Sequence, residues 1–314
     1  MSTPVGGLAE GRRRLDTVYD HLSNPYVLLV LTVGPALTLF VFINILPIAW
    51  AIYAGFFEIP LFSPEWTWTG LGNYVEVFEK STFWVALYRS IVFAGGSVVL
   101  QLVVGTAVAL LINEHFTFKS AVRAIVLVPY TIPTAVLAFL TLWMLNSQYG
   151  IVNQLLVQTG LIAQYTPWFA SEGLAMLVLI LVNSWKFSIF VTLMVLAKLQ
   201  SIPDDLYEAA DVIGANAYQK FRDITLPNLK GVIFIVLLLR GVWMFNKFDI
   251  IWILTKGGPG NSTETAAIFA YKTAMIDNQL GQGAAISVVL FVILAVVAII
   301  YFIVLKPSEE VRVE

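Results

Sequence analysis

The sequence of 314 residues contains no cysteine and only two histidines, His21 and His115. Without thiols the chain forms no disulfide, no thiolate nucleophile and no cysteine-ligated metal site. Two imidazoles so far apart in sequence do not predict a metal centre. Charge is scarce as well, because Asp, Glu, Lys and Arg make up 12% of the residues, about half the share of a soluble domain. The net charge of -2 argues against a nucleic-acid partner.

The sequence also lacks the usual signatures of catalysis. No phosphate-binding GxxxxGK[ST] motif occurs, and the stretch Gly257-Gly258-Pro259-Gly260 lacks the lysine of that motif. No Ser/His/Asp grouping and no pair of carboxylates presents itself. We therefore predict a non-enzymatic chain with no catalytic residue, no metal site and no cofactor of its own.

Apolar residues are abundant instead, at 59% of the sequence with a mean hydropathy of +0.83. They gather in six segments, each near the roughly 20 residues that cross a membrane as a helix. The sequence thus predicts an all-α integral membrane protein with six transmembrane helices, of which the first is kinked at Pro35 and Pro47. The predicted helices are about Tyr26–Ile52, Ser90–Ile112, Ala121–Leu145, Leu174–Leu199, Leu229–Leu254 and Ala284–Leu305.

The basic residues give this topology an orientation. Eleven fall in segments on one side, namely Arg12, Arg13, Arg14, Lys119, Arg123, Lys198, Lys220, Arg222, Lys230, Lys306 and Arg312. The other side holds Lys80, Arg89, Lys256 and Lys272. By the positive-inside rule the richer side is cytoplasmic, so both termini lie in the cytoplasm. We expect a cytoplasmic tail over residues 1–25 and one multi-pass domain over 26–314, in a plasma membrane such as a bacterial inner membrane.

Residues 200–228 form a polar cytoplasmic loop between two apolar segments. Pro203 is suited to open a short helix, and Gly214 suits a left-handed turn after it. A second helix is predicted from about Tyr218 to Leu226, stopping before Pro227. One interpretation is an interfacial helix lying on lipid head groups.

The amino-acid sequence of this loop favours a second interpretation. Glu208-Ala209-Ala210, Gly214, Ile224 and Leu226-Pro227 stand at the spacing of the EAA loop of bacterial ABC-importer permeases, which this stretch resembles. The resemblance implies the type I ABC importer permease fold, in which this loop is a cytoplasmic coupling helix docking on an ATP-binding subunit. ATP and Mg would then be bound by partner subunits. The residues implied in coupling are Leu206, Tyr207, Glu208, Ala209, Ala210, Ile213, Gly214 and Phe221.

Three cations lie away from the ends of the predicted spans, at membrane depth: Lys186 in the fourth, and Arg240 and Lys247 in the fifth. A charge at membrane depth costs at least about 2.5–3 kcal/mol and is expected to face a cavity or a partner. Arg240 and Lys247 are seven residues apart, so we expect them to share one face of a helix, with Trp243 and Met244 between them. An aromatic ring beside donors suits a sugar. The alternative is a structural ion pair, such as Lys247 with Asp249.

The segment Leu254–Thr265 (LTKGGPGNSTET) resembles the carbohydrate branch of these permeases, on the side of the larger maltose permease subunit. The similarity covers about residues 89–305. It implies sugar contacts from the spans flanking the EAA loop, at Lys186, Phe187, Phe190, Arg240, Trp243, Met244 and Lys247. The maltose permease has glycine, tyrosine and asparagines where this chain has Phe187, Phe190, Met244 and Lys247, which argues against maltose itself.

The expected function is therefore that of a permease subunit of an ATP-driven importer for a disaccharide, oligosaccharide or glycoside. The resemblance implies a second, homologous permease chain, two ATP-binding subunits and an extracytoplasmic sugar-binding protein as partners, besides membrane lipid. One alternative is a phosphorylated or acidic substrate such as glycerol-3-phosphate, given the three cations. Another is a secondary transporter driven by an ion gradient, although such a protein would need more intramembrane acids than Asp249.

Overall fold

The computed structural model describes residues 25–60, 62, 65–114 and 117–305. In these residues five helices are long and apolar enough to cross a membrane, and a bent pair of shorter helices brings the number to six when the pair is counted as one broken span. The predicted all-helical membrane fold is confirmed. The tail predicted over residues 1–25 lies, except for Pro25, outside the described residues. The spans are Pro25–Ala54, Ser81–Asn113, Lys119–Thr131 with Thr134–Met144, Glu172–Leu199, Ala217–Phe245 and Leu280–Val304.

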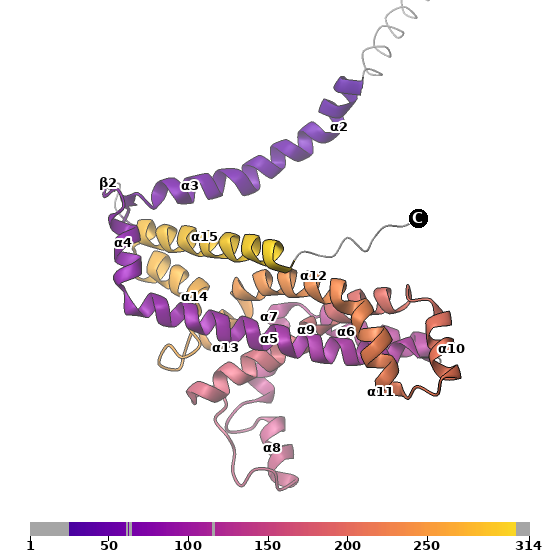
Figure 1. Cartoon of the computed structure of the whole chain (residues 1–314). Helices are drawn as coiled ribbons and strands as arrows, with labels where there is room; N and C mark the ends of the chain where they lie inside the picture. The colour runs from indigo at the N-terminus through magenta and orange to yellow at the C-terminus, as the bar shows by residue number, and fades with distance from the viewer. Residues whose placement is uncertain (1–24, 61, 63–64, 115–116, 306–314) are drawn as a thin grey trace, which may run out of the picture.

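The first span is an arm that diverges from the other helices (Figure 1). It consists of α2 (Pro25–Phe40), the π-helical turn η1 (Val41–Ile45) and α3 (Leu46–Ala54), and α2 buries no residue. The wide turn directly precedes Pro47, where the missing N–H interrupts the helical hydrogen bonds. The arm leads into a two-stranded antiparallel hairpin, β1 (Phe57–Glu58) and β2 (Thr67–Trp68), followed by α4 (Gly72–Glu79).

The centre of the fold is the close pair α5 (Ser81–Asn113) and α9 (Glu172–Leu199), the most extensive helix contact in the described chain. Gly105 makes their approach possible, because a Cβ there would lie 2.6 Å from Cβ of Val191. The helix α12 (Leu226–Phe245) packs on this pair, and α15 (Leu280–Leu305) packs against α3, α4 and α12 in an apolar cluster that it shares with α5.

The third span is not the continuous helix predicted over Ala121–Leu145. It divides into α6 (Lys119–Thr131) and α7 (Thr134–Met144), which meet at 90°. Pro133 explains the break, because proline forces the preceding residue out of the helical region and Ile132 has an extended ψ of 124°. The span was predicted from the hydropathy of the whole segment, and hydropathy does not indicate where a helix bends.

The fifth span ends earlier than predicted, at Phe245 rather than Leu254. Asn246 ends the helix, and its side-chain amide donates a hydrogen bond to the Val242 carbonyl. Asparagine side chains typically compete in this way with backbone N–H groups for helical carbonyls. The chain then turns into short helices on the predicted outer side, where an ion pair joins the buried Glu264 to the partly exposed Lys272. These outer helices are α13 (Asp249–Thr255), α14 (Ala266–Tyr271), the π-helical turn η3 (Lys272–Ile276) and, from an earlier loop, α8 (Ile151–Gln158).

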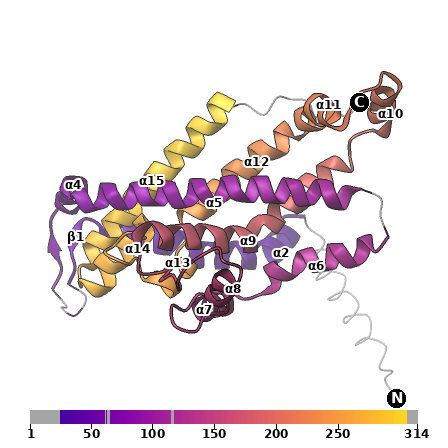
Figure 2. The same ribbon diagram turned by 90° about the horizontal axis from the view of Figure 1, so that it is seen from below.

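The polar loop of residues 200–228 contains α10 (Asp204–Val212), α11 (Ala217–Lys220) and the π-helical turn η2 (Phe221–Thr225). It lies at one end of α5, whereas α4 and the hairpin lie at the other end (Figures 1 and 2). The second helix was predicted to stop before Pro227, and this was wrong. It continues through η2 into α12, because the wider π-helical hydrogen bonds of η2, such as that from the Leu226 N–H to the Phe221 carbonyl, accommodate Pro227 inside the helix.

Candidate functional site

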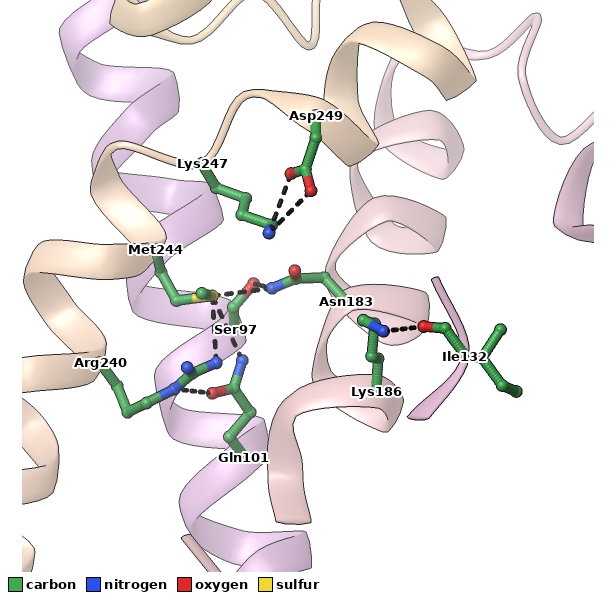
Figure 3. Close-up of polar contacts among 9 residues, drawn as sticks. All are labelled: Ser97, Gln101, Ile132, Asn183, Lys186, Arg240, Met244, Lys247 and Asp249. Atoms are coloured by element: carbon green, nitrogen blue, oxygen red, sulfur yellow. Dashed lines mark hydrogen bonds and ion pairs between the residues drawn. The ribbon is translucent and has the colours of Figure 1, made fainter. Parts of the chain in front are cut away.

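The guanidinium of Arg240 lies in the middle of the bundle. Arg240 is 2% exposed, and its Nε donates to Oε1 of Gln101 on α5 at 2.7 Å (Figure 3). Three rings surround the charge, with the Cζ atom 5.0 Å from the centroid of Phe187 and 5.6 Å from those of Phe190 and Trp243. These distances are typical of cation–π contacts. Within the described residues, Arg240 is thus held by an amide and aromatic faces rather than by a carboxylate.

Met244 lies at the centre of the same polar network. Its sulfur accepts from Nδ2 of Asn183 at 2.9 Å and from Nε2 of Gln101 at 3.5 Å (Figure 3). Asn183 also donates to Oγ of Ser97 at 3.3 Å, whereas its own Oδ1 is buried without a partner in the described chain. A thioether is a weak acceptor, so this network orients the donors without neutralising the Arg240 charge.

Lys186 holds the break in the third span. Its Nζ donates to the carbonyl of Ile132 and, at 3.5 Å, to that of Tyr130. Helix α6 ends just before Pro133, so these carbonyls lack their usual intrahelical partners. Lys186 is 4% exposed. Its ammonium therefore satisfies backbone groups that the bend leaves unpaired inside the membrane.

Lys247 lies beside a surface depression next to Arg240 and Phe187. Lys247 follows the end of α12, so the prediction that it shares a helix face with Arg240 was wrong. The two cations instead contact the same ring, that of Phe187, with Nζ of Lys247 4.5 Å from the ring centroid. Lys247 pairs with Oδ1 of Asp249 at 2.9 Å, the ion pair weighed above as an alternative. Beside them is a depression of about 400 Å³. Its walls are Val242, Trp243, Asn246, Lys247, Phe248 and Asp249.

All seven residues predicted as sugar contacts meet in this one place, which we call the intramembrane cluster: Lys186, Phe187, Phe190, Arg240, Trp243, Met244 and Lys247. They are not equally accessible, since Arg240, Met244 and Lys186 are buried while Trp243 is half exposed and packs edge-on against Phe190. Sequence reasoning missed Gln101 and Ser97. A glutamine inside an apolar span was a signal that could have pointed to Gln101.

The loop of residues 200–228 is tightly held from within. Gly214 has a φ of +76°, as the predicted left-handed turn requires. Asn216 and Gln219 form a reciprocal capping box at the start of α11. An ion pair joins Asp211 to Lys220 across the turn. The two short helices are therefore fixed relative to each other before any partner is present.

The residues implied in coupling differ in their exposure. Tyr207 and Ala210 face inward, and the hydroxyl of Tyr207 lies 2.9 Å from Oγ1 of Thr225. Ile213 and its neighbour Val212, which sequence reasoning did not select, project outward with exposures of 83% and 88%. The remaining members lie at the surface or partly buried, namely Leu206, Glu208, Ala209, Gly214 and Phe221. The loop thus presents an apolar tip on a rigid support.

Relatives of known name extend over most of the chain. The trehalose/maltose transport system permease protein MalF of Thermococcus litoralis is 35% identical over 271 residues, covering 86% of this chain and 91% of the relative. The sulfoquinovosyl glycerol transport system permease protein SmoG of Agrobacterium fabrum is 34% identical, covering 90% and 92%.

Solved structures agree on the fold. A chain of a bacterial alginate ABC transporter, in complex with an alginate pentasaccharide-bound periplasmic protein, superposes with a TM-score of 0.77 at 22% identity, covering 90% of this chain and 95% of that one. The family described as the binding-protein-dependent transport system inner membrane component matches residues 101–306. With these matches the chain belongs to the binding-protein-dependent transport system inner membrane component family.

Proposed function

We propose that the chain is a permease subunit of an ATP-driven importer that carries a sugar, either a disaccharide, an oligosaccharide or a glycoside. Family membership and the names of the two relatives, which transport trehalose or maltose and sulfoquinovosyl glycerol, support this proposal. An extracytoplasmic binding protein would deliver the substrate, and a second, homologous permease chain would complete the pathway. The distribution of basic residues favours cytoplasmic termini in a plasma membrane.

The observation that carries the proposal is the intramembrane cluster. Trp243 offers an exposed ring face, which can stack on the C–H groups of a sugar. Lys247 and Asn246 line the adjacent depression and can donate to hydroxyl oxygens. Behind them Arg240 and Phe187 support these groups. The other cluster members, Lys186, Phe190 and Met244, would hold this surface in place.

The second half of the proposal assigns the loop of residues 200–228 to coupling. Two ATP-binding subunits, which would hold ATP and Mg, are proposed to dock on the two permease chains. Val212 and Ile213 are apolar and exposed at the end of α10, as a residue filling a partner's groove would be. Glu208 is exposed as well, so its carboxylate is available to a partner.

A specific observation favours an acidic glycoside as a second candidate substrate. The seven residues of the cluster include no carboxylate, and the neighbouring Asp249 pairs with Lys247. Arg240 contacts an amide, a sulfur and three rings. An anionic group on the substrate would therefore meet an uncompensated positive charge.

The test is purification of the tagged chain in mild detergent, with mass spectrometry of the proteins that co-elute. We expect an ATPase, a second six-span chain and a binding protein with the wild type. Glu208→Lys should lose the ATPase, while Glu172→Lys, the same exchange at the other end of the bundle, should keep it. A chain that elutes alone in all three forms would contradict the proposal. Thermal shifts of the recovered binding protein with trehalose, maltose and a glucuronide then separate neutral from acidic substrates.

A further inference from the structure

A narrow slot opens between α6, α9 and the end of α5, away from the intramembrane cluster. It holds about 240 Å³. Its walls are Ile112, Arg123, Val126, Leu127, Ile189, Leu193, Leu196 and Gln200. Six of these eight residues are aliphatic, and the two polar ones, Arg123 and Gln200, come from the end of the bundle that carries the loop of residues 200–228. The slot is thus polar at its mouth and apolar along its length.

The helical spacing makes the slot elongated. Gln200, Leu196, Leu193 and Ile189 are four, three and four residues apart, so they form one stripe on α9. At 1.5 Å per residue, these positions span about 16 Å along the helix. Arg123 lies in the second turn of α6, with Val126 and Leu127 one turn deeper on the same face. An elongated apolar molecule with a polar head fits this shape.

Arg123 supplies an unsatisfied donor at the mouth of the slot. It is the single charged residue among the described lining residues. Its Nε is buried and has no hydrogen-bond partner in the part of the chain that the structure describes. A buried donor without a partner costs roughly 1–3 kcal/mol. The charge distribution places this mouth at the cytoplasmic surface of the membrane, where anionic phospholipid head groups lie.

We propose that the slot binds an anionic phospholipid, with the phosphate accepting from Arg123 and an acyl chain lying along Leu196, Leu193 and Leu127. The aliphatic walls offer nothing to a free phosphate ion, whereas they match an acyl chain in length and polarity. The lone cation selects a negatively charged head group over a zwitterionic one. This lipid would brace α6 against α9, next to the break that Lys186 holds. The inference does not depend on which substrate the importer carries.

The experiment titrates the delipidated full-length protein with phosphatidylglycerol or phosphatidylcholine and counts bound lipid by native mass spectrometry. For the wild type we expect about a fivefold preference for phosphatidylglycerol, the factor that corresponds to one basic residue near a membrane surface. Arg123→Gln should abolish this preference, and Arg123→Lys should retain most of it. Leu193→Trp, which fills the slot without changing charge, should reduce the binding of both lipids.

Arg89→Gln is the matched control, because it removes an arginine at the other end of the bundle and should leave the preference unchanged. An unchanged preference in Arg123→Gln, or unchanged lipid binding in Leu193→Trp, would overturn the proposal. A photoreactive residue at position 127 in the intact complex gives an independent readout. Capture of phospholipid is expected there, and capture of a second protein chain instead would show that the slot is a helix interface.

Discussion

The intramembrane cluster and the loop of residues 200–228 differ in the exposure of the side chains assigned to function: these are mostly buried in the cluster and protrude from the loop. In the cluster Arg240 and Met244 are each 2% exposed, and their polar atoms have partners from other helices of the same chain. In the loop, Val212 and Ile213 are the residues that protrude, and the internal bonds serve to hold the backbone beneath them.

This difference indicates how each region is completed. A buried cation in a membrane tolerates little displacement, because every lost contact leaves a charge in a medium that cannot hydrate it. The cluster is therefore assembled within the chain, before a partner or substrate arrives. An exposed aliphatic pair on a rigid turn gains free energy only when another surface covers it. A partner chain that covers the apolar tip of the loop would therefore gain more binding free energy there than at the cluster.

We expect replacement of the exposed aliphatic pair of the loop to have the strongest consequence. Val212→Asp combined with Ile213→Asp should weaken retention of the ATP-binding subunits about 1,000-fold, because two buried aliphatic contacts are worth roughly 4 kcal/mol together. The spans should stay folded, since both side chains are already exposed. Binding of the purified ATPase to immobilised permease measures the loss.

The control for this prediction is Leu71→Asp combined with Val75→Asp, an aliphatic pair at the other end of the bundle that is also more than half exposed. It should retain the ATPase at the wild-type level. Equal binding by the Val212 and Ile213 variant would instead show that the exposed tip of the loop does not contact that subunit.

Removing the charge of Lys186, which joins the cluster to the broken third span, is expected to lower the stability of the protein moderately. Lys186→Met leaves the carbonyls of Tyr130 and Ile132 without their charged donor, which should cost about 1.5–3 kcal/mol. We expect the thermal midpoint of the purified protein to fall by about 5 °C, whereas Lys198→Met in the last turn of α9 should change it little. A variant with wild-type stability but weakened uptake would instead assign Lys186 to direct substrate contact, as the sequence predicts.

The sequence predicted the all-helical membrane fold, the left-handed turn at Gly214 and the seven residues that meet in one cluster. These features follow from local patterns or from spacing that the fold family shares. The broken third span and the early end of the fifth span were not predicted, although Pro133 and Asn246 stood in the sequence. Hydropathy averages over a window, so one residue that redirects the backbone has little weight in it.

The division of the cluster into buried and open members also required the structure. Lys186, Arg240 and Lys247 read alike in sequence, as cations in apolar surroundings. Their roles separate because the bend at Pro133 brings two carbonyls to Lys186, and because α12 ends before Lys247. Likewise Tyr207 and Val212 share one short helix, but Thr225 lies against Tyr207 and no described residue covers Val212.

Gly214 belongs to the support of the loop and lies outside its apolar tip, so we expect a substitution there to have a smaller effect than those above. At Gly214 a Cβ would meet no atom within 4 Å, so Gly214→Ala adds only the backbone cost of a φ of +76°, about 1 kcal/mol. We expect about a fivefold weaker ATPase interaction, with unchanged stability of the spans. Gly160→Ala in the outer loop is the matched control, because its φ is +74° and its surroundings are equally open. If Gly214→Ala binds the ATPase as well as Gly160→Ala does, the loop tolerates a shifted turn, and its rigidity is not what positions Val212 and Ile213.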